Sequence, residues 1–313
     1  MSRGVCVLLA GWIGLLPVQL FAQREGPISL IEDPQTYFTD ERQSWIGREI
    51  CFLPCPNAAM KNPYFDWYYN PYDLNGSKPR KRDLLWRRGM FEAVYLGQIH
   101  MVKPHKDYWR MGFFWKVRLL DDNSVVYYWD DGESGVFNFG FVDDFQEARK
   151  HIGQKLWSRK RHVLYSMDGK NAILLRHLEP VYLKDVRWGD YGNFPLKFVL
   201  ETQNGKLGYV WNTTYAKFVD EWYTYDPRER FRYVRLQDWA LIEHQQLRMN
   251  MSPEMVLLSW GDPSHIETRR TKDGSEEEIW TYPGVAETKY FVYFRNRKLI
   301  RVRWEQNKKK MKH

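Results

Sequence analysis

Adjacent aspartates are the residues of this sequence whose type and spacing could support catalysis. They occur at Asp121-Asp122, Asp130-Asp131 and Asp143-Asp144, and two carboxylates can divide the acid and base roles in glycoside hydrolysis. Each pair lies in or beside a predicted turn, where aspartate is favoured because its side chain bonds to nearby backbone. The sequence contains no G-x-S-x-G, H-E-x-x-H or phosphate-binding glycine motif. We therefore expect no enzyme, no catalytic residue and no cofactor, with a cell-wall hydrolase as the weakest alternative.

Export is predicted by the first 22 residues, which differ in composition from the rest of the chain. A positive start, MSRG, precedes the apolar run VCVLLAGWIGLLPVQL, and Ala22 offers a cleavage point. This is the pattern of a secretory signal peptide. An uncleaved membrane anchor is the alternative, although the run is marginal for spanning a bilayer. A lipid anchor is less favoured because Cys6 lies too early in the chain.

Two cysteines remain once a signal peptide is removed, Cys51 and Cys55 in ICFLPCP. Disulfides persist in exported proteins, so this spacing predicts a small local disulfide. A metal site would need more ligands close by, and the eight histidines are scattered along the chain. We expect no bound metal.

Basic residues outnumber acidic ones, 47 to 39, which gives a formal charge of +8. They gather in SKPRKRDLLWRR, from Ser77 to Arg88, and in the tail at 307–313. Such a loop and tail could make peripheral contact with an anionic membrane surface, but solvated charge is the simpler interpretation. The export signal argues against nucleic acid as a partner, and the oligomeric state is left open.

An internal repeat organises the middle of the chain. WIGREICF at 45–52 is echoed by HIGQKLWS at 151–158, and KVRLLDDNSVVYYW at 116–129 aligns with KFVLETQNGKLGYV at 197–210. Apolar and polar residues alternate between turns, and aromatics make up 17% of the chain, so we expect mostly β structure. Asn204-Gly205 suits a two-residue type I′ turn. Each copy has the size of a small barrel and resembles the SH3-like domains of exported bacterial proteins.

The repeat sets the expected domain boundaries. We expect a signal peptide at 1–22, a linker at 23–44, SH3-like repeats at 45–148 and 151–225, and a long loop at 54–90 within the first repeat.

Four aromatic residues of the second repeat are candidates for ligand binding: Trp188, Tyr191, Tyr209 and Trp211. A groove of the barrel could hold a peptidoglycan peptide or glycan against them. The alternative, which we favour, is that these side chains fill the core of a small barrel.

The segment MNMSPEMVLLSWGDPSHI, from Met249 to Ile266, predicts a short helix with its own start and stop signals. Ser252 can cap the N-terminus and Pro253 suits the first turn. Gly261 can take the positive φ that ends a helix, and Pro263 prevents its continuation. Such a short helix must pack on other elements to be stable.

Further elements surround this helix. LQDWALIEHQQL predicts a preceding helix, with Leu236 and Trp239 on its apolar stripe. Three strands are expected around 277–282, 289–294 and 299–304. Because Arg297 follows Asn296 where a type I′ turn prefers glycine, we expect a longer turn between the last two strands.

This order of elements resembles the SmpA/OmlA family, the small lipoprotein component of the outer-membrane β-barrel assembly machinery. The matching blocks are NMSPEMVLLSWGDP, EIWTY with Trp280 and Tyr282, YFVYF and NRKLIRVRW. Asn250 stands where the family usually has glycine. The resemblance implies a domain at 232–306 with two helices and a three-stranded antiparallel sheet, followed by the basic tail. We expect Trp260 and Val256 to cover that sheet.

These observations predict a mainly β protein: two tandem SH3-like barrels and a small α+β C-terminal domain. We expect an exported, non-catalytic protein of a Gram-negative cell envelope, periplasmic or associated with the outer membrane. It would act as an interaction or scaffold module for envelope proteins, linked to outer-membrane assembly or integrity. The alternative is a ligand-binding protein that recognises peptidoglycan.

Overall fold

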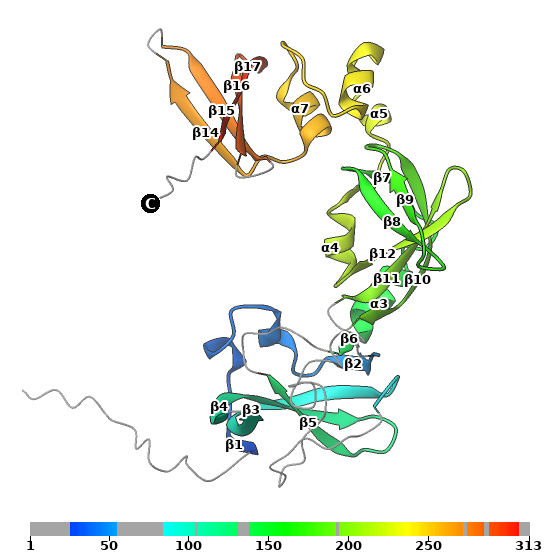
Figure 1. Cartoon of the computed structure of the whole chain (residues 1–313), viewed down its shortest axis with the longest axis vertical. Coiled ribbons are helices and arrows are strands. Elements are labelled where there is room, and N and C mark those ends of the chain that lie inside the picture. Colours follow the sequence, from blue (N-terminus) through cyan, green and yellow to red (C-terminus); the bar gives the residue numbers. More distant parts are fainter. Residues whose placement is uncertain are drawn as a thin grey trace, which may run out of the picture. The chain divides into compact units, whose positions relative to one another are not determined.

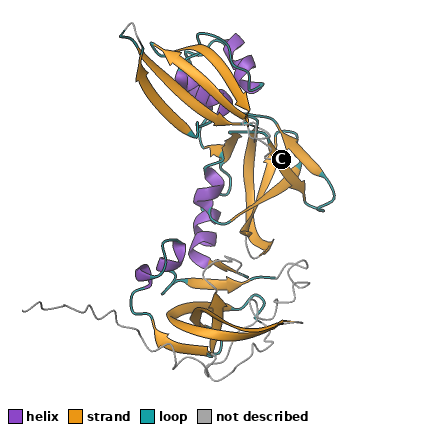
Figure 2. Cartoon of the chain, turned by 60° about the vertical axis from the view of Figure 1, so that its left-hand side comes forward, coloured by secondary structure: helices purple, strands orange, loops and turns teal. Residues whose placement is uncertain are grey.

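The computed structural model describes residues 26–54, 84–103, 106–130, 138–191, 194–271, 274–284 and 288–306. The chain is mainly β, as composition and alternation predict. It divides into two compact units, residues 1–138 and 139–313, whose elements are traced in Figure 1 and coloured by type in Figure 2. The predicted signal peptide, most of the loop at 54–90 and the tail at 307–313 lie outside the described residues.

The first unit is an antiparallel sheet built on one long hairpin. β3 (Arg88–Lys103) and β4 (Lys106–Leu119) form this hairpin and pair from Gly89 to Lys103. The strand order is β5-β4-β3-β2, and β1 also pairs with β3. The other strands of this unit are β1 (Gly26–Leu30), β2 (Glu49–Phe52) and β5 (Val125–Asp130).

Residues 26–44 belong to this sheet unit instead of forming the linker that we expected. β1 pairs with β3, and two short 3-10 helices follow, η2 (Pro34–Thr36) and η3 (Glu41–Ser44). Ile31 and Phe38 from this segment are buried. Elements this short carry little periodicity, which is why the sequence alone did not reveal them.

Aromatic packing and an ion pair with a buried carboxylate stabilise the core of the first unit. The Trp45 ring lies 5.3 Å from that of Phe91 and 4.8 Å from that of Trp115, between centroids. Arg42 Nη1 lies 3.1 Å from the buried carboxylate of Asp130, to which Trp115 Nε1 also donates over 3.3 Å. Asp130 thus has a structural role in this core.

The second unit contains a curled seven-stranded sheet in the order β13-β7-β10-β11-β12-β8-β9. Register shifts in the pairing of β10 with β11 bend the sheet. One face is buried, which we call the inner face, and α3 (Val142–Arg149) and α4 (Tyr215–Val219) add side chains to its core. The strands are β7 (Lys155–Ser158), β8 (His162–Ser166), β9 (Ala172–Leu175), β10 (Pro180–Tyr191), β11 (Phe194–Thr202), β12 (Leu207–Asn212) and β13 (Trp222–Tyr223), and the short β6 (Phe139–Phe141) leads into α3.

The C-terminal part of this unit has four strands instead of the expected three. β15 (Glu276–Pro283), β16 (Thr288–Arg295) and β17 (Lys298–Gln306) lie near the predicted positions, and β14 (His265–Arg270) pairs with β15. Every residue of β14 is exposed. It lacks a buried face, so its sequence shows no alternation from which a strand could be predicted.

Three helices precede this sheet: α5 (Pro227–Arg230), α6 (Leu236–Glu243) and α7 (Pro253–Trp260). Trp239 and Ile242 form the buried side of α6. Leu236, which we expected on that stripe, is 88% exposed because it lies at the first turn and points away from the core.

Two hairpin turns of the second unit differ from our expectations. The expected type I′ turn at Asn204-Gly205 is a longer loop, and the turn expected to be longer, at Asn296-Arg297, has type I′ dihedrals. The β11–β12 connection is a three-residue loop in which Thr202 and Lys206 pair and only Gly205 has a positive φ, 72°. Between β16 and β17, Arg295 pairs with Lys298, and the two residues between them have φ of 49° and 56°, as in a type I′ turn. The predicted longer turn at Asn296 and Arg297 is therefore wrong.

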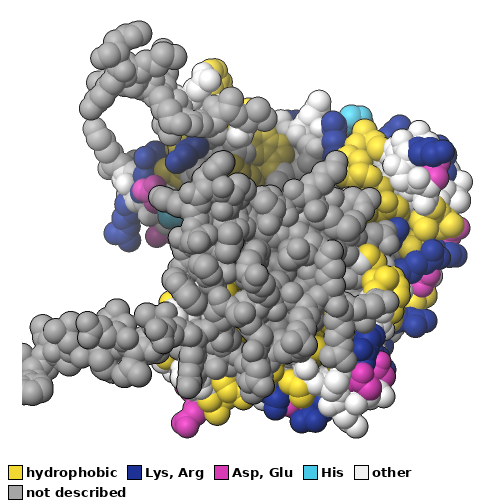
Figure 3. All heavy atoms as spheres, turned by 60° about the horizontal axis from the view of Figure 1, so that its bottom comes forward, with side chains coloured by type: hydrophobic (Ala, Val, Ile, Leu, Met, Phe, Trp, Pro, Cys, Tyr) yellow, Lys and Arg dark blue, Asp and Glu magenta, His cyan; other side chains and the backbone are white. Residues whose placement is uncertain are grey.

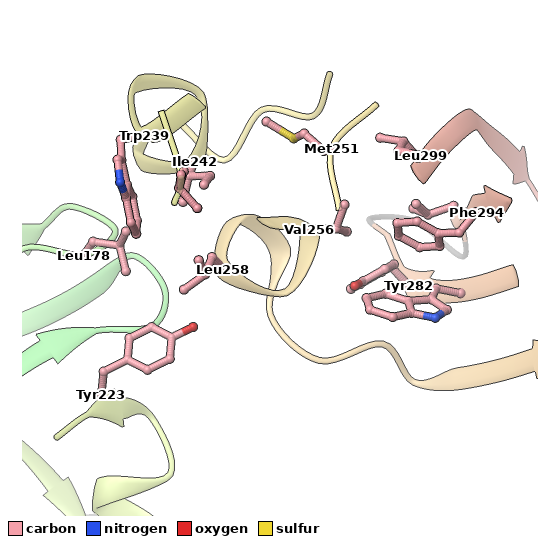
Figure 4. Close-up of a cluster of buried hydrophobic side chains, with 13 residues drawn as sticks. Leu178, Tyr223, Trp239, Ile242, Met251, Val256, Leu258, Tyr282, Phe294 and Leu299 are labelled. Carbon is pink, nitrogen blue, oxygen red and sulfur yellow. The ribbon is translucent and has the colours of Figure 1, made fainter. Parts of the chain in front are cut away.

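One hydrophobic cluster joins the second sheet to the C-terminal helices, although we expected two separate domains. Leu178 and Tyr223 from the sheet region pack with Trp239 and Leu258 of the helices (Figure 4). On the other side of α7, Val256 faces the strands of the C-terminal sheet (Figure 4). Shared burial of this kind stabilises both parts together.

Candidate functional site

The second sheet separates Trp188 from Tyr209 and Trp211, which are three of the four aromatic residues predicted to bind a ligand. Trp188 lies on the inner face, where its ring stacks on Phe145 of α3 at 4.2 Å and 10°. Arg187 lies opposite Lys197 in the register of β10 with β11, and Lys197 lies opposite Trp211 in the register of β11 with β12. Because successive residues point to opposite faces, Trp188 and Trp211 lie on different sides of the sheet. Trp188 is therefore partly buried against the core of this sheet.

Tyr209 and Trp211 lie together on the opposite, outer face of the sheet. Tyr165 of β8 pairs with Tyr209, and its ring centroid lies 5.8 Å from that of Tyr209 and 4.9 Å from that of Trp211. The Tyr209 and Trp211 rings are 4.8 Å apart and nearly perpendicular. Tyr191 ends β10, and its side chain lies outside the described residues.

Aliphatic side chains extend this aromatic cluster across three strands. Val163 shares the face of Tyr165, Leu174 of β9 pairs with Val163, and Leu207 shares the face of Tyr209. Val163, Leu174 and Leu207 are 49%, 65% and 43% exposed. We call this set the outer apolar face: Val163, Tyr165, Leu174, Leu207, Tyr209 and Trp211.

Positive charge borders the outer apolar face. The Lys197 amine lies 3.9 Å from the Tyr209 ring centroid, which is a cation–π contact. Arg187, which lies opposite Lys197 on the neighbouring strand β10, forms an ion pair with Asp185 over 2.7 Å. An apolar centre with a charged rim is the usual anatomy of a protein-binding surface.

Two of the six residues of the outer apolar face, Tyr209 and Trp211, were candidates from the sequence. Val163, Tyr165, Leu174 and Leu207 were not. The signal was present in HVLYS and AILL, whose exposed and buried residues alternate as in a half-buried hairpin. Only the pairing of β8 with β12 shows that this hairpin extends the face that Tyr209 occupies.

A cavity of about 590 Å³ lies between the second sheet and the segment that carries α5 and α6. Its charged lining residues are Lys155, Arg176, Glu179 and Lys206 from the sheet side, and Asp226, Arg228 and Glu243 from the helix side. The Lys155 amine lies 5.0 Å from the ring centroid of Trp157, which also lines the cavity. The wall therefore carries charges of both signs beside one aromatic ring.

His177 is buried in the wall of this cavity and ties it to α7. Its Nε2 donates to the Leu258 carbonyl over 2.5 Å. Burial lowers the pKa of this imidazole below its ordinary value, because desolvation outweighs the hydrogen bond. His162, stacked on Trp222 at 4.5 Å, has its pKa lowered by burial as well.

The predicted structural residues of the C-terminal part lie at the ends of α7. The Ser252 hydroxyl accepts from the Met255 N–H over 3.4 Å, and Pro253 occupies the first turn. Gly261 has φ of 80°, and its carbonyl accepts from the Tyr282 hydroxyl over 3.0 Å.

The remaining predicted residues connect α7 to its neighbours. Trp260 contacts the Tyr282 ring edge-on at 5.4 Å and donates from Nε1 to the Gln245 carbonyl over 2.9 Å. Trp280 packs on Phe294 in the shared core, and Pro263 lies between α7 and β14. Asn250 has φ of 68°, in the left-handed region that asparagine tolerates better than most residues.

The aspartate pairs are engaged in local structural contacts. Arg87 forms ion pairs with Asp121 and Asp122. Its hydrogen bond is the main cause that lowers the pKa of the Asp121 carboxyl. For Asp122, hydrogen bonds with Ser124 lower the pKa more than Arg87 does. Asp143 and Asp144 lie in the first turn of α3, where negative charge stabilises a helix. Asp131 lies outside the described residues.

Cys51 is buried, and Cys55 lies outside the described residues. The disulfide between them stays a prediction. In the described ranges, no three His, Cys, Asp or Glu side chains gather as a metal site would require.

Comparisons of the chain with protein-family models, with curated proteins and with solved structures find no match. Among the described residues, no helix combines the length and the apolar character needed to cross a bilayer.

Proposed function

We propose that this chain is an exported, non-catalytic interaction protein of the Gram-negative cell envelope, which binds a partner protein through the outer apolar face. The signal-peptide pattern and the SmpA/OmlA-like segment support the envelope location and a link to outer-membrane assembly or integrity. The observation that carries the proposal is the outer apolar face itself.

This surface differs from the scattered apolar residues that every protein exposes. Hydrophobic side chains commonly reach the surface between charged ones, as on the face shown in Figure 3. On β8, β9 and β12, by contrast, the exposed side chains of Val163, Tyr165, Leu174 and Leu207 adjoin the half-buried Trp211 and the buried ring of Tyr209. Contiguous exposed apolar surface of this kind marks interaction sites. Tyrosine and tryptophan are also enriched where protein interfaces bury most surface.

Site-specific photocrosslinking in envelope extracts tests the proposal. A photoreactive residue at Leu207 is expected to capture one protein, and Tyr165→Ser with Leu174→Ser should remove that adduct. The matched control is Tyr233→Ser with Leu236→Ser, which makes the same chemical changes at positions 60% and 88% exposed elsewhere in the unit. An adduct that survives the first pair, or is equally lost with the second, would exclude this face as the binding site.

The cavity between the second sheet and the helices favours a second candidate function, recognition of a peptidoglycan peptide or glycan. Its volume of about 590 Å³ suits a small ligand. The cations and carboxylates of its wall match a peptide or amino sugar that carries both charges.

Sedimentation with purified sacculus separates the two candidates. Ligand recognition predicts co-sedimentation without any partner protein, weakened by Lys155→Gln with Arg176→Gln and unchanged by Tyr165→Ser with Leu174→Ser. A protein that stays in the supernatant would eliminate the second candidate.

A further inference from the structure

The C-terminal sheet has one face that the described helices do not cover. α7 packs on the face that carries Trp280, Tyr282 and Phe294. Residues between these along the strands point to the other side, which we call the arginine face. Its members include Arg269, Glu277, Ile279, Phe291, Tyr293, Arg295, Arg301 and Arg303.

Arginine side chains cover the apolar centre of this face. Tyr293 is only 8% exposed, and the Arg301 guanidinium lies 4.0 Å from its ring centroid. The carboxylate of Glu277, which is 3% exposed, pairs with Arg269 over 2.7 Å and with Arg295 over 3.6 Å. Two of the four arginines therefore have a carboxylate partner.

Arg301 and Arg303 of β17 differ from this pair, because neither forms an ion pair with any described residue. The Arg301 Nε is buried and has no hydrogen-bond partner among the described residues. An unpaired buried donor is costly, so a carboxylate placed against Arg301 and Arg303 would be stabilised.

The same strand forms an open edge of the sheet. β17 is the last strand in the order β14-β15-β16-β17. At its start, the Leu299 N–H donates to the Met251 carbonyl over 2.8 Å and its carbonyl accepts from the Asn250 N–H over 2.9 Å. From residue 302 to 306 the side chains are exposed, and no described strand lies beside them.

Side chains alternate in character along this open edge. Val302 and Trp304 are 40% and 66% exposed and lie on the face opposite Arg301 and Arg303. A strand added here would meet Val302 and Trp304 on one face, and two guanidinium groups followed by the carboxylate of Glu305 on the other.

We propose that β17 from Arg301 to Gln306 accepts an extended, acidic segment of a partner protein as an additional strand. Main-chain hydrogen bonds to the open edge supply affinity, and alternating side chains supply specificity. Carboxylates of the partner pair with Arg301 and Arg303 on one face, and its apolar residues pack on Val302 and Trp304 on the other.

Net charge favours an acidic segment over a second copy of this chain as the occupant. The stretch from Arg301 to Gln306 carries two arginines and one carboxylate, that of Glu305, so two such strands side by side would bring four guanidinium groups together with only two carboxylates. Like charges in neighbouring cross-strand positions destabilise a sheet. The site uses strands other than those of the outer apolar face, so each proposal can fail without the other.

Binding of designed peptides to the full mature chain tests this inference. A labelled peptide of alternating Glu and Val is expected to bind in fluorescence anisotropy, and one of alternating Lys and Val is expected not to bind. Arg301→Gln with Arg303→Gln should weaken the Glu-Val peptide by about tenfold or more. The matched control, Lys170→Gln with Lys217→Gln, removes two exposed lysines elsewhere and should leave binding unchanged.

A backbone-modified peptide separates strand addition from simple charge attraction. N-methylation at alternate residues removes main-chain donors and should abolish binding while the charges stay. Equal binding of the methylated peptide, or equal weakening by both pairs of substitutions, would overturn the inference. So would a concentration-dependent dimer in sedimentation velocity that the Glu-Val peptide cannot dissociate. Tyr165→Ser with Leu174→Ser should leave peptide binding intact.

Discussion

The imidazole of His177 donates from Nε2 to the main-chain carbonyl of Leu258 over 2.5 Å. Leu258 lies in the last turn of α7, where carbonyl groups have no partner within the helix. His177 precedes β10 of the second sheet, so this bond caps the helix with a side chain from another part of the unit. A neutral ring suffices for it, and burial favours the neutral form.

Stability of the second unit is predicted to fall as the pH drops below the ordinary histidine pKa of 6.5. The folded pKa values of His162 and His177 are lowered by burial, so the unfolded chain binds protons first as the pH falls. Protonation therefore favours unfolding between the unfolded and folded pKa values, by at most about 1.4 kcal/mol per pH unit for each proton. Urea unfolding at about pH 7.5 and about pH 5.5 measures this loss.

His177→Gln should reduce that pH dependence, because glutamine can donate to the Leu258 carbonyl but does not titrate. His162 remains in this variant, so part of the dependence should persist. His265→Gln changes an exposed histidine on β14 and serves as the control. A pH dependence identical in all three proteins would show that His177 is not responsible.

Leu258→Ala is predicted to destabilise the second unit by about 2–5 kcal/mol. Leu258 is 2% exposed and lies in the cluster that joins the second sheet to the helices, so its removal leaves a cavity there. Leu236→Ala makes the same change at a side chain that is 88% exposed, and should alter stability by no more than about 0.5 kcal/mol. Similar losses in the two variants, measured by urea unfolding, would contradict this assignment of the core.

Arg297→Gly is predicted to stabilise the C-terminal hairpin by about 0.5–1 kcal/mol. The residue has φ of 56°, which costs energy for a residue with a Cβ atom but not for glycine. The change also removes an exposed ion pair with Glu254, which contributes little. Arg297→Gln loses the same ion pair but keeps the strained φ. In thermal unfolding, the glycine variant should therefore have a higher melting temperature than both the unsubstituted protein and the glutamine variant. Glycine at or below the stability of glutamine would refute the type I′ assignment.

Signals within a few residues of one another allowed the sequence alone to predict much of the local structure. The mainly β class follows from alternation, because a strand with one buried face repeats every second residue. The limits of α7 follow from Ser252, Pro253 and Gly261, because capping and φ preferences act within one turn. These properties depend on neighbours in the chain, which the sequence states directly.

Only the tertiary structure decided which faces are covered and which stay open. Trp188 and Trp211 look alike in the sequence, yet one stacks on α3 and the other lies on the outer apolar face. Leu236 fits a helical stripe but points into solvent. Likewise, the edge of β17 is open only beyond Leu299, because the segment before α7 forms hydrogen bonds with Leu299 and does not continue along the strand. Burial is set by elements far apart in the sequence, so local patterns show that a residue can be buried and only packing determines whether it is.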